Sequence, residues 1–177
     1  MQVRVETAET GQAKSFSYFR IMNGMLTRPG TYFNENLSDH DLRTPFFFLM
    51  ISIVFNVGAS LTVLKGNPLI SAGILALNAF VMPIITAAVS VVIIRIITQD
   101  SISFIRIFSI HAFAWGTTLL ASWIPMLFWI TEPWKWFLIT KGFAKGCSLT
   151  YLQAITASII IAGFIICGFY FLMDITS

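Results

Sequence analysis

Long uncharged stretches alternate with short polar ones along this 177-residue chain. Four runs contain no Lys, Arg, Asp or Glu: 44–64, 66–94, 107–131 and 146–173. Each is longer than the roughly 20 residues that an α-helix needs to cross about 30 Å of hydrocarbon. A backbone in lipid must satisfy its own N–H and C=O groups, and the alternation typical of a membrane barrel strand does not occur in these runs. The pattern therefore predicts an all-α, polytopic membrane protein.

Composition supports a membrane protein. Hydrophobic residues make up 56% of the chain and charged residues only 11%, whereas soluble domains carry about 25% charged residues. Ten of the nineteen charged residues lie in the first 43 positions. The formal charge of +3 forms no basic run that would indicate nucleic-acid binding. We expect the lipid bilayer to be the main surrounding of residues 44–177.

The number of spans depends on residues 126–143, which carry Glu132 and Lys135. If this segment lies on one surface, seven basic residues fall on the N-terminal side of the membrane and four on the other. If it crosses, the division is nine and two, which fits the positive-inside rule better. We therefore expect five transmembrane helices, the fourth being short and bent at Pro133. Their predicted bounds are 45–64, 69–97, 104–124, 126–143 and 149–173.

The fourth predicted span must accommodate two charges. Glu132 and Lys135 are three residues apart, so they share one helical face and could pair. Alternatively they could lie near the outer interface, with Trp134 and Trp136 as aromatic anchors.

The N-terminal part is divided into a polar, flexible segment, 1–14, and a region of interfacial helices, 15–43. No signal peptide is indicated. Apolar residues recur at helical spacing on one side of 15–27, which predicts an amphipathic helix at the headgroup boundary, or one packed on its own protein. Pro29 ends this helix, and a second short helix could follow at 31–37. The candidate interface residues of the two segments are Phe16, Phe19, Met22, Leu26, Pro29 and Phe33.

Four stretches follow one another in an order that resembles the YIP domain family, membrane proteins named for their interaction with Rab-type GTPases. They are MLTRPGTYFNENL, DLRTPFFFLM, DSISFIRIFSIHAFAW and KGFAKGCSLTYLQA, in the last of which Gly142, Ser148 and Ala154 fall on the family's pattern. The resemblance implies five spans, a cytosolic N-terminus and a non-catalytic role.

The chain departs from the family pattern before and within the third predicted span. Gln99 and Asp100 replace glycines that often precede this span, and His111 and Trp115 replace a tyrosine and a proline. These departures argue against GTPase binding and favour a bacterial-type member in the cytoplasmic membrane, with the C-terminus outside.

Polar residues inside the predicted spans are the candidates for function: Asn56, Asn78, Thr86, Ser90 and His111. The first four could form a polar path for a solute, or hydrogen bonds that hold helices together. We favour helix packing, because no carboxylate or lysine joins this set in the sequence and ion-coupled transporters usually place an ionisable group there. His111 is expected to hydrogen-bond to a neighbouring helix, with pH sensing or ligand contact as the alternative.

Signatures of catalysis, metals and cofactors are missing from the sequence, so we expect no enzyme, metal site or cofactor. Asp39, His40 and Asp41 are adjacent and would point in different directions on a helix, which disfavours a metal site. Cys147 and Cys167 would lie about 30 Å apart on one helix and cannot pair. The acceptor motif at Asn36 lies on the predicted cytosolic side, so glycosylation is not expected.

The sequence thus predicts a non-catalytic membrane scaffold, assembly partner or membrane-organising protein of YIP type, or an accessory subunit of a membrane complex. Its expected partner is another membrane protein or a second copy, bound through small-residue helix faces. The alternative is a small transporter or channel subunit that uses the polar helix face around Asn78 and Thr86.

Overall fold

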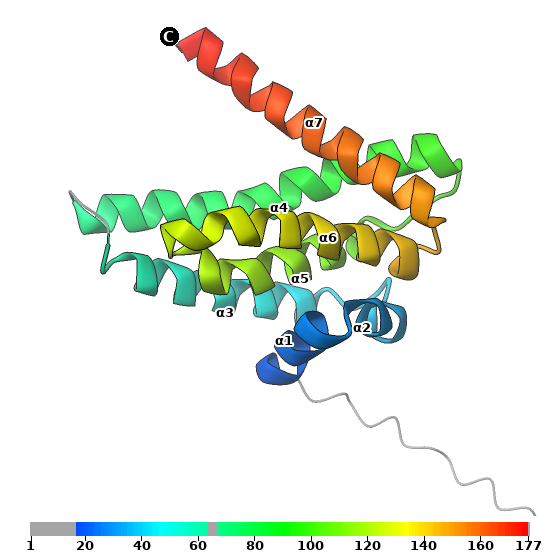
Figure 1. The fold of residues 1–177 in the computed structure, drawn as a ribbon, viewed down its shortest axis with the longest axis horizontal. Coiled ribbons are helices and arrows are strands. Elements are labelled where there is room, and N and C mark those ends of the chain that lie inside the picture. Colours follow the sequence, from blue (N-terminus) through cyan, green and yellow to red (C-terminus); the bar gives the residue numbers. More distant parts are fainter. Residues whose placement is uncertain (1–16, 64–66, 177) are drawn as a thin grey trace, which may run out of the picture.

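A computed structural model describes residues 17–63 and 67–176, and within them every regular element is helical (Figure 1). The helices are α1 (Tyr18–Thr27), α2 (Pro29–Asn36), α3 (Arg43–Ser60), α4 (Pro68–Thr98), α5 (Phe104–Ser122), the short 3-10 helix η1 (Pro125–Leu127), α6 (Phe128–Gly146) and α7 (Tyr151–Thr176). The all-α prediction is confirmed for this part of the chain. Each of the five predicted spans corresponds to one helix, with bounds within four residues of those expected.

Four helical segments are long and apolar enough to cross a membrane: Arg43–Ser60, Pro68–Thr98, Phe104–Ser122 and Tyr151–Gly168. The helix α6 matches α5 in length, at 19 residues, but its four charged residues make it less apolar. It runs back beside α5 along the length of the bundle (Figure 1). The sequence left open whether residues 126–143 cross the membrane. Most of them belong to one long helix, α6, which continues through Pro133.

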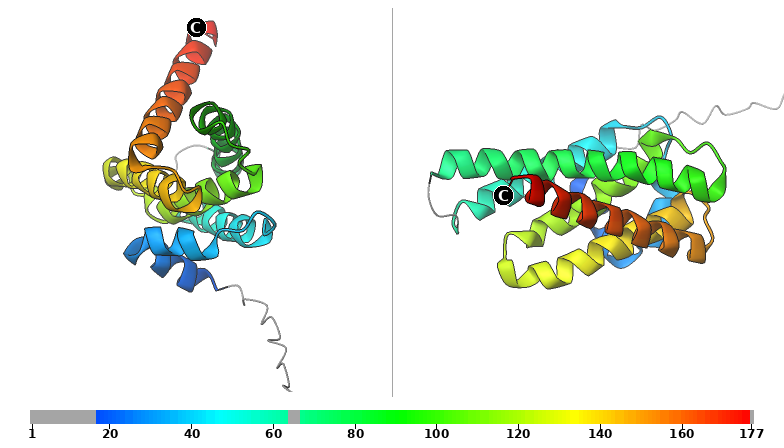
Figure 2. Two further views of the ribbon diagram at one scale, coloured as in Figure 1. Left: turned by 90° about the vertical axis from the view of Figure 1, so that its right-hand side faces the viewer. Right: turned by 90° about the horizontal axis from the view of Figure 1, so that it is seen from above.

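The helix α5 lies at the centre of the bundle. Twelve of its 19 residues are buried, against seven of 18 in α3 and seven of 31 in α4, and it packs against α3, α4 and α6. Gly116 lets α3 approach closely, since a Cβ there would lie 2.7 Å from the Phe48 ring. The helix α7 packs mainly along α4 and α6, and its C-terminal part projects away from the other helices (Figure 2).

The ends of α4 show why this helix begins and stops where it does. Asn67 accepts hydrogen bonds from the backbone N–H groups of Leu69 (3.1 Å) and Ile70 (3.4 Å), which is the usual chemistry of a helix N-cap. At the other end Gln99 adopts a left-handed conformation with φ of 59°. This is the backbone geometry that glycine adopts most easily, and position 99 is one where the resembled family often has glycine.

Replacing Gln99 by glycine should raise the free energy of unfolding by up to about 1 kcal/mol, because glycine carries no penalty in the left-handed region. Thr98→Gly, one residue earlier and still in α4, should have the opposite sign. Chemical unfolding of the purified protein in detergent measures both. Equal destabilisation by the two substitutions would contradict this account of the helix end.

The N-terminal helices α1 and α2 pack against one side of the bundle, next to α5 and α6 respectively (Figure 1). The buried residues of α1 are Ile21 and Met25, while Phe19 is 75% exposed and Leu26 is 49% exposed. Ile21 and Met25 therefore form the buried side of α1, and of the predicted apolar side Met22 packs partly against the core. Phe33 of α2 is fully buried, so it is a core residue and not an interface residue.

Three candidate interface residues remain, and the structure describes two of them. Met22 and Pro29 are half-buried. Phe16 lies outside the described residues. Pro29 is the first residue of α2. This helix therefore begins two residues before the expected segment.

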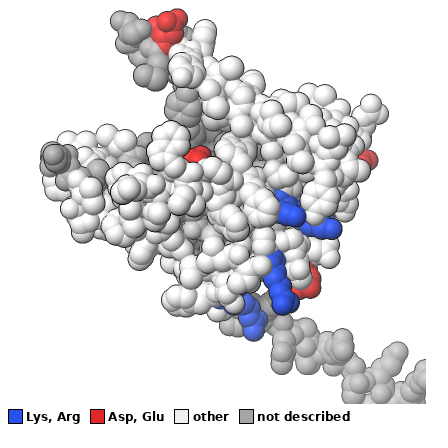
Figure 3. Space-filling model, viewed as in Figure 1, with Lys and Arg blue, Asp and Glu red and all other residues white. Residues whose placement is uncertain are grey.

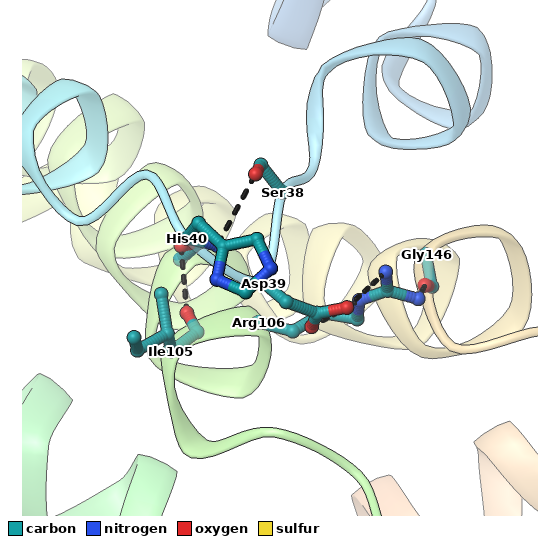
Figure 4. A network of polar contacts seen from close by, with 7 residues as sticks. Ser38, Asp39, His40, Ile105, Arg106 and Gly146 are labelled. Atoms are coloured by element: carbon teal, nitrogen blue, oxygen red, sulfur yellow. Dashed lines mark hydrogen bonds and ion pairs between the residues drawn. The ribbon is translucent and has the colours of Figure 1, made fainter.

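Arg106 of α5 joins three segments at one end of the bundle (Figure 4). Its Nε and one terminal nitrogen donate to the two carboxylate oxygens of Asp39, at 2.9 and 2.7 Å, and the other terminal nitrogen donates to the Gly146 carbonyl at 3.1 Å. Asp39 precedes α3 and Gly146 ends α6, so one guanidinium connects α3, α5 and α6. Asp39 is thus engaged in an ion pair, while Asp41 caps α3 by accepting from the N–H groups of Arg43 and Thr44.

Arg106→Ala should lower the free energy of unfolding by about 1 kcal/mol, since it removes three hydrogen bonds but the pair with Asp39 is about a third exposed. Arg95→Ala is the matched control, because the Arg95 side chain makes one hydrogen bond to the described part of the chain, to the Ile102 carbonyl. Thermal unfolding of both variants in one detergent gives the comparison. An Arg106 variant no less stable than the Arg95 variant would contradict the connecting role.

Candidate functional site

A cavity of about 550 Å³ lies between α3, α4, α5, α6 and α7. In the space-filling view the molecule is hollowed beneath α7, and acidic atoms are visible in the hollow, whereas the basic side chains on this face gather at one end of the bundle (Figure 3). The polar residues of the cavity wall are Asn56, Ser60, Asn78, Thr86, Thr118, Ser122, Thr131, Glu132 and Lys135. Apolar residues complete it, among them Trp115, Trp136, Ile165 and Ile166.

The charged part of the wall is an ion pair within α6. Lys135 Nζ donates to Glu132 Oε1 at 2.7 Å, and the ammonium also lies 4.0 Å from the centre of the Trp115 ring. The Lys135 residue is only 5% exposed, while the Glu132 side chain is 36% exposed. The carboxylate stabilises the buried ammonium by charge, and the ring of α5 adds a cation–π contact.

Most uncharged polar groups of the wall already have partners within the protein. Asn56 Nδ2 donates to the Leu119 carbonyl at 2.8 Å and to Ser122 Oγ at 2.9 Å, which fastens α3 to the end of α5. Thr86 Oγ1 donates to the carbonyl of Met82 at 2.8 Å, one turn earlier in α4. Asn56 thus joins two helices, as the packing interpretation expects, whereas Thr86 bonds within its own helix.

Asn78 differs from these residues. Its side chain is exposed in the cavity wall and makes no hydrogen bond to the described part of the chain. An amide in this position has two donors and an acceptor available to a bound molecule. Of the polar residues predicted on α4, Asn78 is therefore the one best placed to contact a ligand.

His111 is fully buried and lies outside the cavity wall. Its Nε2 is 2.8 Å from Ser90 Oγ, and the Ser90 hydroxyl donates to the Thr86 carbonyl at 2.6 Å. Because that hydroxyl proton is already used, we assign Nε2 as the donor to Ser90 and Nδ1 as unprotonated. The expectation of a hydrogen bond to a neighbouring helix is confirmed, since Ser90 belongs to α4 and His111 to α5.

The structure brings together only part of the predicted set. Asn56, Asn78 and Thr86 line one cavity, whereas Ser90 and His111 form a separate buried contact. No carboxylate or lysine belongs to the polar stripe in the sequence, but Glu132 and Lys135 of α6 line the same cavity. Pairing of these two residues, one of the two alternatives that the sequence left open, is the arrangement that the structure shows.

The signal that could have found this site was the pair itself. A glutamate and a lysine at i and i+3 in the apolar first half of a helix indicate a side that faces a polar cavity or another charge. The sequence could not show which helix lies opposite. The cavity arises because α6 folds back beside α5 and presents Lys135 to Trp115.

Part of the cavity wall is apolar and lies beside exposed apolar residues. Ile166 of α7 lies in the wall and is 55% exposed, and Ile74 and Leu77, which flank Leu75 and Asn78 on α4, are 65% and 64% exposed. A charged and amide-bearing interior with a hydrocarbon edge suits a molecule that has a polar head and an apolar remainder.

The described residues contain no group of three or more His, Cys, Asp or Glu side chains arranged to hold a metal ion. The arrangement around Lys135 offers charge, hydrogen bonds and an aromatic face. These are the elements of a binding site.

Comparison of the chain with family models, curated proteins and solved structures finds no match in any of the three. The resemblance to the YIP domain family stays a prediction.

Proposed function

We propose that this protein is a non-catalytic integral membrane protein of five spans that binds a molecule with a polar group in the cavity lined by α3, α4, α5, α6 and α7, as a transporter or carrier subunit does. The observation that carries the proposal is Lys135, a 5% exposed ammonium in the wall of a 550 Å³ cavity. A charged side chain within a membrane helix is costly, and such residues usually mark a substrate pathway. In this proposal α6 crosses the membrane, so the pair is inside it.

The charge distribution supports the crossing. Lys141 and Lys145 lie near the end of α6 that adjoins α2, while Glu132 and Lys135 lie nearer its other end. With α6 as a span, nine basic residues share the side of the N-terminus, which the positive-inside rule places in the cytosol. The C-terminus is then outside, and the bacterial cytoplasmic membrane remains the proposed location.

Native mass spectrometry of protein purified gently from its membranes tests the binding function. We expect a retained small molecule on the wild-type protein that is lost in Lys135→Met. The matched control is Lys145→Met, the same substitution at an exposed position of α6 that does not line the cavity. Absence of any retained molecule, or equal retention in all three proteins, would contradict the proposal.

A second function, a scaffold or assembly partner of YIP type, is favoured by α1. Phe19 and Leu26 expose apolar surface on a helix that precedes the spans, which suits a protein partner at the membrane surface. Gentle purification should then recover a companion protein that Phe19→Ser loses and Asn23→Ser, at an exposed polar position of α1, retains. A wild-type protein recovered alone would count against this function.

A further inference from the structure

The cavity pairs one positive and one negative group, and this balance limits the kind of molecule that can bind. We infer that its ligand is a zwitterion, a molecule that carries an ammonium group and an acidic group close together. The inference rests on the proposed binding function and specifies the chemical class of the ligand. The Lys135–Glu132 pair supplies the observation.

Each half of the pair has capacity left for a ligand. Lys135 makes one hydrogen bond in the described structure, to Glu132, and an ammonium has three N–H groups. Glu132 uses Oε1 for that bond, and its side chain is 36% exposed in the cavity wall. An acidic group can therefore accept from Lys135 while an ammonium donates to Glu132.

Charge balance favours a zwitterion over a singly charged ligand. The pair is neutral as a whole, so an anion alone would leave a net negative charge in the site and a cation alone a net positive charge. Burying an uncompensated charge is strongly unfavourable in surroundings of low polarity. A zwitterion compensates both groups and leaves the site neutral.

The cavity also indicates the size and entry of the ligand. A volume of about 550 Å³ can hold a free amino acid or the head of an aminophospholipid with the first part of its chains. The apolar lining residues Leu75 and Ile166 would suit hydrocarbon chains that remain in the membrane. The free amino acid and the lipid head carry the same two groups, an ammonium and an acid. A binding experiment with both separates the two sources.

Binding to the wild-type protein is measured by native mass spectrometry with three probes: phosphatidylethanolamine, phosphatidylglycerol of the same acyl chains, and the amino acid leucine. We expect phosphatidylethanolamine or leucine to bind at least about tenfold more tightly than phosphatidylglycerol. Preference for phosphatidylethanolamine would identify a membrane source, and preference for leucine an aqueous one. Equal or tighter binding of phosphatidylglycerol would overturn the inference.

Replacing either member of the pair by an uncharged residue tests the charge of the ligand. A zwitterion should lose at least about tenfold in affinity in Lys135→Met and also in Glu132→Gln. An anionic ligand would bind Glu132→Gln more tightly, and a cationic one would bind Lys135→Met more tightly, and either result would overturn the inference. The wild-type probe comparison decides the matter if a variant does not fold. A retained molecule that needs Lys135 but is not a zwitterion would refute the inference and leave the proposed function standing.

Discussion

Glu132→Ala lowers the free energy of unfolding by about 3 kcal/mol, the low end of the range for breaking a buried ion pair. The group left behind is the Lys135 ammonium, which is 5% exposed and, among the described residues, would keep only the Trp115 ring as a charge-stabilising contact. The low end is expected because the removed carboxylate is 36% exposed and water can approach its position. Chemical unfolding of the purified protein in mixed detergent micelles measures the loss.

The double variant Glu132→Ala/Lys135→Met separates the pair from simple loss of contacts. Methionine keeps much of the lysine volume without the charge, so the double variant should recover most of the stability lost in Glu132→Ala. Glu35→Ala, at an exposed position of α2, should change little. A double variant less stable than Glu132→Ala would mean that the charge of Lys135 is not the source of the effect.

Gly142→Ala should cost about 2 kcal/mol of unfolding free energy, because α5 and α6 meet at this glycine. An added Cβ would overlap the Ile110 side chain and would lie 3.3 Å from the Ile110 Cβ, and Ile110 is fully buried. The side chain has no room to move away. Gly163→Ala in α7 is the matched control, since nothing lies within 4 Å of its added Cβ.

The source of the Gly142 effect can be isolated by a double-mutant cycle with Ile110→Ala. Removing the outer carbons of Ile110 should relieve part of the overlap, so Gly142→Ala should cost less in that background. The same unfolding measurement gives all four free energies. Equal costs in both backgrounds would show that the contact with Ile110 is not responsible.

The existence of the long helices was predictable, because uncharged runs longer than about 20 residues determine them with little help from tertiary structure. The hydrogen-bonded role of His111 was also predictable, since a buried imidazole needs a partner. What the sequence could not show was that the partner is Ser90. Identity of a partner depends on which helix faces lie opposite, and periodicity within one helix does not contain that information.

The errors in the predicted site have the same origin. Lys135 and Asn78 lie on different helices, 57 positions apart, and only the fold brings them to one cavity. On α1, two apolar sides compete, and Ile21 and Met25 pack on the protein rather than the side containing Phe19. Helical spacing identified apolar residues there but could not determine which of them face the bundle.

Passage of α6 through the membrane, with Glu132 and Lys135 inside, is tested most directly by labelling its two ends. Single cysteines replace Trp129, which is 81% exposed, and Lys145, which is exposed, in a protein with Cys147 and Cys167 changed to serine. A thiol reagent that does not cross membranes should label position 129 in intact cells and position 145 only in inverted vesicles. Labelling of both positions from the same side would contradict the crossing and the membrane cavity that depends on it.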